Sequence, residues 1–344
     1  MKIIINLNIM KNTIYLTFIS LVIVSACQPK KELTINKETM ASLGEKHKIE
    51  FAGLANYYKD QIVKDSLNTE LYVGLAESEI LLFAFGYIPN EEAVPRAKKA
   101  FQRAYELDSL NSNVQKMSGI LKFLDKDWAS AEKAFQKSIA LDSTNLNTRH
   151  WYSLYLIAMN RVEESMKQSD IILSMDKKNK YLLGRGSLFY FQYRFEEMKP
   201  LLLKTIEYDP QAPWAYDWLG MAYNGLSEHD DAIKTYFKAF ELSDGTVEVG
   251  GGLGHALANA GETELAEEMA NYYIEASKSR YLPPVQRSFI HLGLEDYDMA
   301  IELLEQAYQE QSWFLLFMQI EHWYDPIRDD QRFIDIMDKM AFPE

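Results

Sequence analysis

Small and apolar side chains recur along most of the chain with a period of 34 residues. One column of this repeat is mostly alanine and keeps the spacing, with a single step of 33. Its members are Ala97, Ala131, Ser165, Met198, Ala232, Ala266 and Ala300. A second column stands twelve positions earlier and comprises Gly119, Ser153, Gly186, Gly220, Gly254 and Ser288. A fixed period of this size indicates stacked helical units rather than one globular core.

Each unit is predicted to be a pair of antiparallel helices that cross at the second column. A large side chain at the crossing would hold the backbones apart, and such overpacking costs roughly 1–3 kcal/mol. The positions four residues after the first column are mostly apolar and are expected to pack between the helices; they are Phe101, Phe135, Ser169, Leu202, Tyr236, Ala270 and Leu304. Glycine and proline are sparse, 16 and 10 of 344 residues. The pattern therefore favours an all-α fold over residues 49–344.

Residues 213–245, PWAYDWLGMAYNGLSEHDDAIKTYFKAFELSDG, resemble the tetratricopeptide repeat (TPR). The resemblance implies an α-α superhelix, a right-handed solenoid of about seven TPR helix pairs with a C-terminal capping helix. The series of repeats from LYVGLAES to YDPIRDDQRFIDIMDKM is similar to the TPR region C-terminal to bacterial winged-helix regulators, adenylate cyclases and serine/threonine kinases. Only a signal peptide and a tether are expected before residue 49, so this second resemblance implies architecture and binding rather than those proteins' outputs.

An apolar run, IYLTFISLVIV at residues 14–24, precedes the single cysteine of the chain. Its length suits the core of a signal peptide better than a bilayer span. The following VSAC resembles a bacterial lipobox, which implies lipid on Cys27 and removal of residues 1–26. Residues 27–48 then form a lipidated cysteine and a flexible tether. The alternative is a short buried segment with an incidental cysteine, and translation from Met10 is an alternative to translation from Met1.

Inner-face positions carry the predicted partner site, because the first helix of each TPR pair lines the concave face in the family that the chain resembles. Read in that register, the expected groove residues are Lys116, His150, Trp151, Lys180, Tyr190, Trp214, Asp217, Trp218, Met221 and Asn224. Aromatic anchors among polar groups suit an extended peptide or an amphipathic helix. The alternative is that the tryptophans pack between neighbouring helices. Ile120 follows Lys116 where carboxylate-clamp repeats have asparagine, so chaperone-tail binding of that kind is not expected.

Charge and motif content narrow the function further. The net charge is −14, with 50 acidic and 36 basic residues, and this disfavours a nucleic-acid surface. One cysteine excludes an internal disulfide, and the six histidines form no pair at i and i+4. The stretch GTVEVGGGLGHALANAG lacks the glycine spacing and preceding strand of a phosphate loop, and Gly250 to Gly252 are expected only to loosen a helix start. No catalytic residue, metal site or cofactor is predicted.

These observations favour a lipid-anchored, non-enzymatic TPR scaffold at the cell envelope, with a protein or peptide partner in the groove. Gln28 follows the cysteine where aspartate would signal inner-membrane retention, so the lipobox resemblance implies the outer membrane in a Gram-negative host. One alternative is a ligand-sensing regulatory module that acts on a separately encoded signalling or transport partner. An enzyme with an unrecognised site is the third reading.

Overall fold

The computed structural model describes residues 34–343 apart from 36, 43 and 177–180. Lys37–Glu344 forms one compact unit of the chain. Its described residues contain helices and no strand, which confirms the predicted all-α superhelix. Cys27 and the predicted signal peptide lie outside the described residues.

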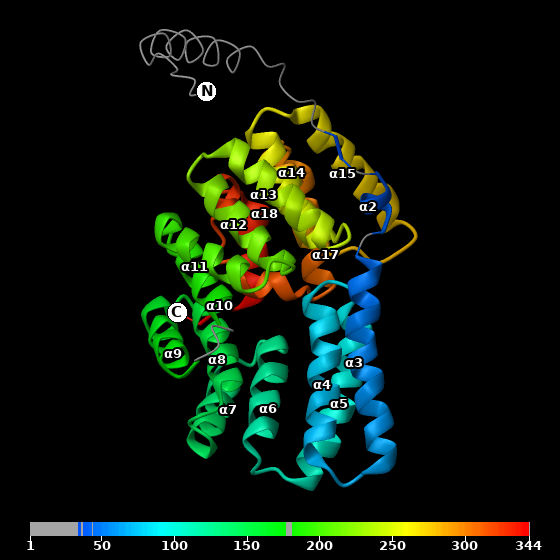
Figure 1. Ribbon diagram of the computed structural model, residues 1–344, viewed down its shortest axis with the longest axis vertical. Coiled ribbons are helices and arrows are strands. Elements are labelled where there is room, and N and C mark those ends of the chain that lie inside the picture. Colours follow the sequence, from blue (N-terminus) through cyan, green and yellow to red (C-terminus); the bar gives the residue numbers. More distant parts are fainter. Residues whose placement is uncertain (1–33, 36, 43, 177–180, 344) are drawn as a thin grey trace, which may run out of the picture. The chain divides into compact units, whose positions relative to one another are not determined.

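Seven helix pairs follow one another along the described residues (Figure 1). The pairs are α4 (Thr69–Ala84) with α5 (Asn90–Leu107), α6 (Ser112–Leu124) with α7 (Trp128–Leu141), α8 (Leu146–Ala158) with α9 (Val162–Met175), α10 (Leu182–Tyr190) with α11 (Phe195–Tyr208), α12 (Pro213–Gly225) with α13 (His229–Leu242), α14 (Val247–Asn259) with α15 (Thr263–Ser277), and α16 (Pro284–Gly293) with α17 (Tyr297–Gln309). Before them lie α2 (Lys37–Ser42) and α3 (Glu45–Lys64); after them come two 3₁₀ helices, η1 (Trp313–Phe317) and η2 (His322–Ile327), and α18 (Gln331–Met340).

The residues of the two sequence columns lie where the helices of a pair pack against each other. All seven members of the first column, from Ala97 to Ala300, have 0% exposure. A Cβ added to Gly220 would lie 2.8 Å from the ring of Tyr236, and one added to Gly119 would lie 2.7 Å from the ring of Phe135. Only a small residue therefore lets the two helices approach until the aromatic ring of the second covers the backbone of the first.

In most pairs, the turn between the two helices contains one residue in the left-handed conformation, and this position recurs with the period of the repeat. These residues are Lys126, Asn160, Tyr193, Ser227, Gly261 and Glu295, with φ between +54° and +80°. In each case the next amide donates to the carbonyl five residues earlier, at 2.8–3.0 Å. This pattern is the Schellman end of a helix, and it satisfies carbonyls that the helix leaves open. Only Gly261 and Asn160 among these are residue types that favour this conformation, so residue composition does not reveal the motif.

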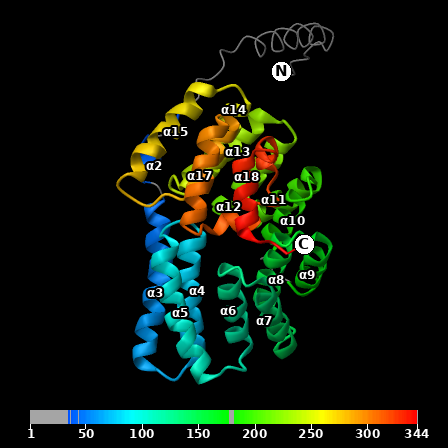
Figure 2. The ribbon, with the colours of Figure 1, turned by 180° about the vertical axis from the view of Figure 1, so that it is seen from behind.

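Residues 37–42 and 45–48, which belong to the predicted tether, are helical. The loop after α2 is fixed because the amide of Gly44 donates to the carbonyl of Asp244 at 2.7 Å, and the Ser42 hydroxyl donates to the Asp244 carboxylate. Gly44 has a φ of +75°, which favours glycine. The Arg280 guanidinium also donates to the carbonyl of Ala41 at 3.0 Å. Figures 1 and 2 both show α2 beside α15, so this segment adds to the solenoid.

The glycine run at the start of α14 serves close packing rather than loosening. A Cβ on Gly251 would lie 2.3 Å from the backbone oxygen of Gln286, and one on Gly250 would lie 1.9 Å from the Tyr273 hydroxyl. Gly252 faces the ring of Tyr236 in the same way, at 2.7 Å. The expectation that these residues only weaken a helix start is therefore wrong, because each glycine allows a close approach by another part of the fold.

Candidate functional site

The inner face of the superhelix, where the partner groove was predicted, is partly covered by the chain's own C-terminal segment, residues 313–342. Trp313 packs edge-to-face on Trp151 of α8, with ring centroids 5.8 Å apart. Phe317 stacks on Phe191, which follows α10, at 6.2 Å. Trp323 stacks on the ring of a histidine in α14, His255, at 4.2 Å. The segment therefore contacts the inner helices of several repeats.

Polar contacts fix the same segment to the repeats. The Tyr190 hydroxyl donates to a carboxylate oxygen of Glu321 at 2.6 Å, across 131 residues of sequence. The indole Nε1 of Trp128 donates to the carbonyl of Ala341 at 2.8 Å. Trp313 is only 8% exposed, and Leu315 and Met318 of the segment are also buried. The C-terminal segment is therefore part of the core, and its release would expose a large apolar area.

The predicted groove residues separate into three groups according to where the structure places them. The buried members are Lys116, Trp151, Tyr190, Asp217 and Asn224. The half-buried members are His150, Trp214, Trp218 and Met221. Lys180, like the lipidation candidate Cys27, lies outside the described residues.

Two of the predicted groove residues, Trp218 and Tyr190, lie in contact. Trp218 meets Tyr190 edge-to-face with centroids 5.3 Å apart. Trp214 instead stacks on Phe85, which follows α4, at 5.1 Å. The alternative, packing of the tryptophans between neighbouring first helices, matches Trp218 of α12 against Tyr190 of α10, whereas Trp151 packs on Trp313 of the C-terminal segment. Contact between a partner and the buried members stays a prediction, and for Trp151 and Tyr190 it requires the C-terminal segment to move.

Glu77 of α4 organises the polar end of the inner face. It accepts from Lys116 Nζ at 2.9 Å, from Asn147 Nδ2 at 3.0 Å and from Trp151 Nε1 at 3.3 Å. Burial acts to raise the pKa of Glu77, but the charge of Lys116 and these hydrogen bonds outweigh it, so the pKa is lowered. Lys116 thus already has an internal carboxylate. Sequence reasoning missed Glu77 because its partners lie 39 to 74 residues away.

Asp217 of α12 is buried and Glu248 of α14 is half-buried, and each carboxyl group has a buried oxygen without a partner among the described residues. Asp217 is 3% exposed, and its Oδ1 has no hydrogen-bond partner among the described residues; the same holds for Glu248 Oε2. Burial raises the pKa of Asp217 to about 8. Burial, and then the charge of Asp217, raise the pKa of Glu248 well above its usual range. Burial thus favours the uncharged form of both groups, which reduces the cost of placing them away from water.

His255, on the same helix as Glu248, contacts a polar and an aromatic side chain of the inner face. Asn224 Nδ2 donates to His255 Nδ1 at 3.2 Å. Burial, and then the neighbouring His322, lower the pKa of His255 to about 3, so its ring is neutral when it stacks on Trp323. The described residues contain no group of three or more His, Cys, Asp or Glu side chains that could hold a metal ion.

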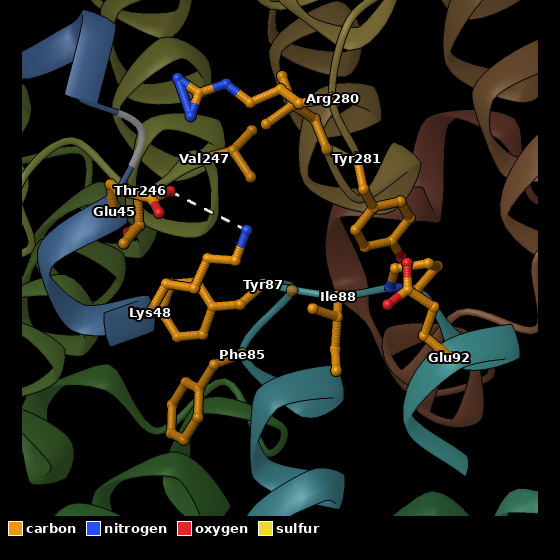
Figure 3. Close-up of a pocket in the computed structure, with 13 residues that line it drawn as sticks. Glu45, Lys48, Phe85, Tyr87, Ile88, Glu92, Thr246, Val247, Arg280 and Tyr281 are labelled. Carbon is orange, nitrogen blue, oxygen red and sulfur yellow. Dashed lines mark ion pairs between the residues drawn. The ribbon is translucent and has the colours of Figure 1, made fainter. Parts of the chain in front are cut away.

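A pocket of about 350 Å³ lies where the first repeat meets the sixth and seventh (Figure 3). We call it the end pocket; its lining includes Lys48, Tyr87, Glu92, Val247, Arg280 and Tyr281. The Nζ of Lys48 lies 4.0 Å from a carboxylate oxygen of Glu45. Burial, and then the charge of Glu310, raise the pKa of Tyr281, so its hydroxyl stays protonated. Cationic, anionic and aromatic groups together suit a small polar molecule.

No helix of the described part of the chain has both the length and the apolar character needed to cross a membrane.

Comparisons with known proteins place the fold. No family model matches the chain. Superkiller protein 3 of Schizosaccharomyces pombe (strain 972 / ATCC 24843) is 30% identical over 133 residues, which are 36% of this chain and 9% of that protein. The chain therefore spans less than a tenth of the length of this curated relative.

Solved structures share the architecture at low sequence identity. A chain of the APC/C hetero-tetramer Cut9–Hcn1 has a TM-score of 0.59 and 13% identity, over 85% of this chain and 52% of that chain. The human IFIT1 dimer with m7Gppp-AAAA has a TM-score of 0.55 and 13% identity, over 79% of this chain and 71% of that chain. These similarities show a TPR-like fold.

Proposed function

We propose that the protein is a non-enzymatic, lipid-anchored scaffold that holds a protein or peptide partner at the cell envelope. The observation that carries the proposal is the repeat itself. Seven helix pairs bury the same columns of small residues and present different side chains on their surfaces. A solenoid of this kind offers neighbouring repeats as one extended binding surface. Asp217 of the inner face is buried, and burial raises its pKa to about 8.

The anchor rests on the sequence VSAC and the apolar run before it. Two or more acyl chains on Cys27 would give stable attachment, because each buried CH₂ contributes about 0.8 kcal/mol. Gln28 supports the outer membrane as the destination in a Gram-negative host.

The anchor is tested by a Cys27→Ser variant, with Ser20→Ala in the same apolar stretch as the control. The wild type and the control should sediment with membranes, and mass analysis should find lipid on their N-terminal peptide. Cys27→Ser should lose both properties. Membrane attachment of the Cys27→Ser variant at the wild-type level would refute lipid anchoring.

The partner is tested by affinity purification from detergent-solubilised membranes, followed by reconstitution with the purified candidate. His150→Ala/Met221→Ala removes two half-buried inner-face side chains outside the C-terminal segment. We expect a stoichiometric complex for the wild type and weaker binding for this variant. If no protein co-purifies above the level found with an unrelated lipoprotein, the scaffold proposal fails.

Nucleic acid is excluded from this proposal as the partner, although the human IFIT1 structure contains m7Gppp-AAAA. A nucleic-acid surface needs clustered lysine and arginine to neutralise phosphates, whereas this chain has a net charge of −14. The purified protein should therefore show no binding to a fluorescent single-stranded oligonucleotide at physiological salt.

The end pocket favours a second candidate function, a ligand-sensing regulatory module that acts on a separately encoded partner. A ligand bound there would join the first repeat to the sixth and seventh repeats. At 100 times its dissociation constant, such a ligand should raise the free energy of unfolding by about 2.7 kcal/mol. A thermal-shift screen of small polar metabolites tests this function, and a Lys48→Ala variant should lose the response if the end pocket is the site.

A further inference from the structure

A second concave surface lies on the side of the superhelix formed by α5, α6 and α7. We call it the lysine groove; it has a volume of about 490 Å³ and its lining includes Phe101, Tyr105, Ser118, Lys122, Lys133 and Lys137. Three lysines and no acidic residue line it. This balance contrasts with the net charge of −14 of the whole chain.

The three lysines have no partner in the described part of the chain. Among the described residues, none forms an ion pair or a hydrogen bond with the ammonium group of Lys122, Lys133 or Lys137. Lysines elsewhere on the repeats do: Lys98 lies 2.7 Å from Asp125, and Lys199 lies 3.0 Å from Glu228. The groove therefore holds positive charge that the fold itself does not neutralise.

The walls of the lysine groove differ in chemistry. Lys133 and Lys137 are exposed and stand four residues apart on α7, so their side chains project from the same face. Like charges at this spacing slightly destabilise a helix, and a bound anion relieves that repulsion. On α5, Phe101 and Tyr105 are also four residues apart, with ring centroids 5.8 Å from each other. One wall is thus cationic and the other aromatic.

We propose that the lysine groove binds an acidic segment of a partner protein in an extended conformation. Alternate side chains of an extended peptide point in opposite directions. Acidic side chains can then face Lys133 and Lys137 while apolar side chains face Phe101 and Tyr105. The Ser118 hydroxyl on the floor can bond to the peptide backbone. This proposal rests on the scaffold function above and names the chemistry of its partner.

Other anionic occupants fit the groove less well. A membrane surface is flat and negatively charged, whereas the site is concave and lies on a chain of net charge −14. A nucleic acid would meet only three lysines and the repulsion of the remaining surface. An acidic peptide presents its few charges at the groove alone, so charge complementarity favours it.

The test uses a fluorescent peptide of alternating glutamate and phenylalanine, with an alternating glutamine–phenylalanine peptide as the probe control. Binding to the full-length mature protein is measured by fluorescence anisotropy. Lys133→Glu/Lys137→Glu reverses the cationic wall at two exposed positions. Lys204→Glu/Lys238→Glu is the matched protein control, because both its lysines stand at the repeat position of Lys137, on α11 and α13, with the same change in net charge.

The wild type and the matched control should bind the glutamate peptide, and added salt should weaken binding. The groove variant should bind roughly tenfold more weakly, since two charge pairs are lost and replaced by repulsion. Three results overturn the proposal: no binding of the glutamate peptide, equal binding of the glutamine peptide, or equal binding by the groove variant. Lysine-dependent binding of a single-stranded oligonucleotide at physiological salt also overturns it.

Failure of this proposal is distinguishable from failure of the scaffold function. If membrane partners are recovered equally with the wild type and with Lys133→Glu/Lys137→Glu, the lysine groove is wrong and the scaffold stands. If the wild type recovers no specific partner, the scaffold function fails whatever the peptide result.

Discussion

The glycine run of α14 allows a sharp test of how closely the repeats must pack. In a Gly251→Ala variant the new Cβ would lie 2.3 Å from the backbone oxygen of Gln286 and 3.0 Å from its carbonyl carbon. Both atoms belong to the backbone of α16, so no side-chain rotation relieves the overlap. The two helices must separate locally, and overpacking of this kind costs roughly 1–3 kcal/mol.

Gly53 of α3 is the matched control. It is also a helical glycine, but a Cβ added there would meet no atom within 4 Å. Replacing an exposed helical glycine by alanine stabilises a helix by about 0.5–1 kcal/mol. Gly251→Ala gains the same helix propensity as Gly53→Ala, but its Cβ also overlaps the backbone of Gln286. The difference in free energy of unfolding between the two variants therefore isolates the packing cost, about 1–3 kcal/mol.

Urea unfolding followed by far-UV circular dichroism measures this difference. Gly53→Ala should raise the urea midpoint, and Gly251→Ala should lower it relative to Gly53→Ala, with similar slopes in both cases. If both substitutions stabilise the protein equally, α14 and α16 do not approach as closely as described. The packing explanation of the glycine run would then be refuted.

Three further predictions concern the inner face. The pKa of Asp217 is near 3.9 in the unfolded chain and about 8 in the folded protein, so between these pH values the folded state holds an extra proton and its stability falls as pH rises. The Asp217→Asn variant lacks this group, so it should lose less stability than the wild type between about pH 5 and pH 8 in urea titrations. An equal loss in the two proteins would contradict this. Glu77→Gln should destabilise the protein by about 3 kcal/mol in urea unfolding because Lys116 is left without its anion, and Glu77→Leu/Lys116→Met should recover part of that loss. Trp313→Ala should lower the free energy of unfolding by about 3–5 kcal/mol; a change below about 1 kcal/mol would show that the C-terminal segment is not core.

The turn motif shows why some regular features escaped prediction. The left-handed position recurs with the repeat, but Lys126, Tyr193 and Ser227 occupy it as well as Gly261. The backbone hydrogen bonds of the turn are available to every residue type, so they leave no signature in composition. The helix at residues 37–42 was not expected from the sequence for a related reason. Residues 37–42 have no repeat pattern, and the contacts of Ser42 with Asp244 and of Ala41 with Arg280 show how they are held.

The sequence by itself determined the helix pairs and their packing columns. Gly220 and Tyr236 meet within one pair, sixteen residues apart, and the same small-opposite-large contact recurs for Gly119 with Phe135 and for Gly186 with Leu202. A contact that repeats with the chain leaves a periodic trace, and period, fold class and pairing all follow from it. The same register correctly assigned Trp151, Tyr190 and Asp217 to the first helix of their pairs.

Only the tertiary structure decided which of those side chains remain exposed. Helix register gives the direction of a side chain but not what covers it, and the cover here comes from far along the chain. Glu321 reaches Tyr190 across 131 residues, and the carbonyl of Ala341 reaches Trp128 across 213 residues. Such contacts occur once and leave no period. The same holds for the lysine groove, where three consecutive helices place unpaired charges opposite aromatic rings because the backbone path brings those walls together.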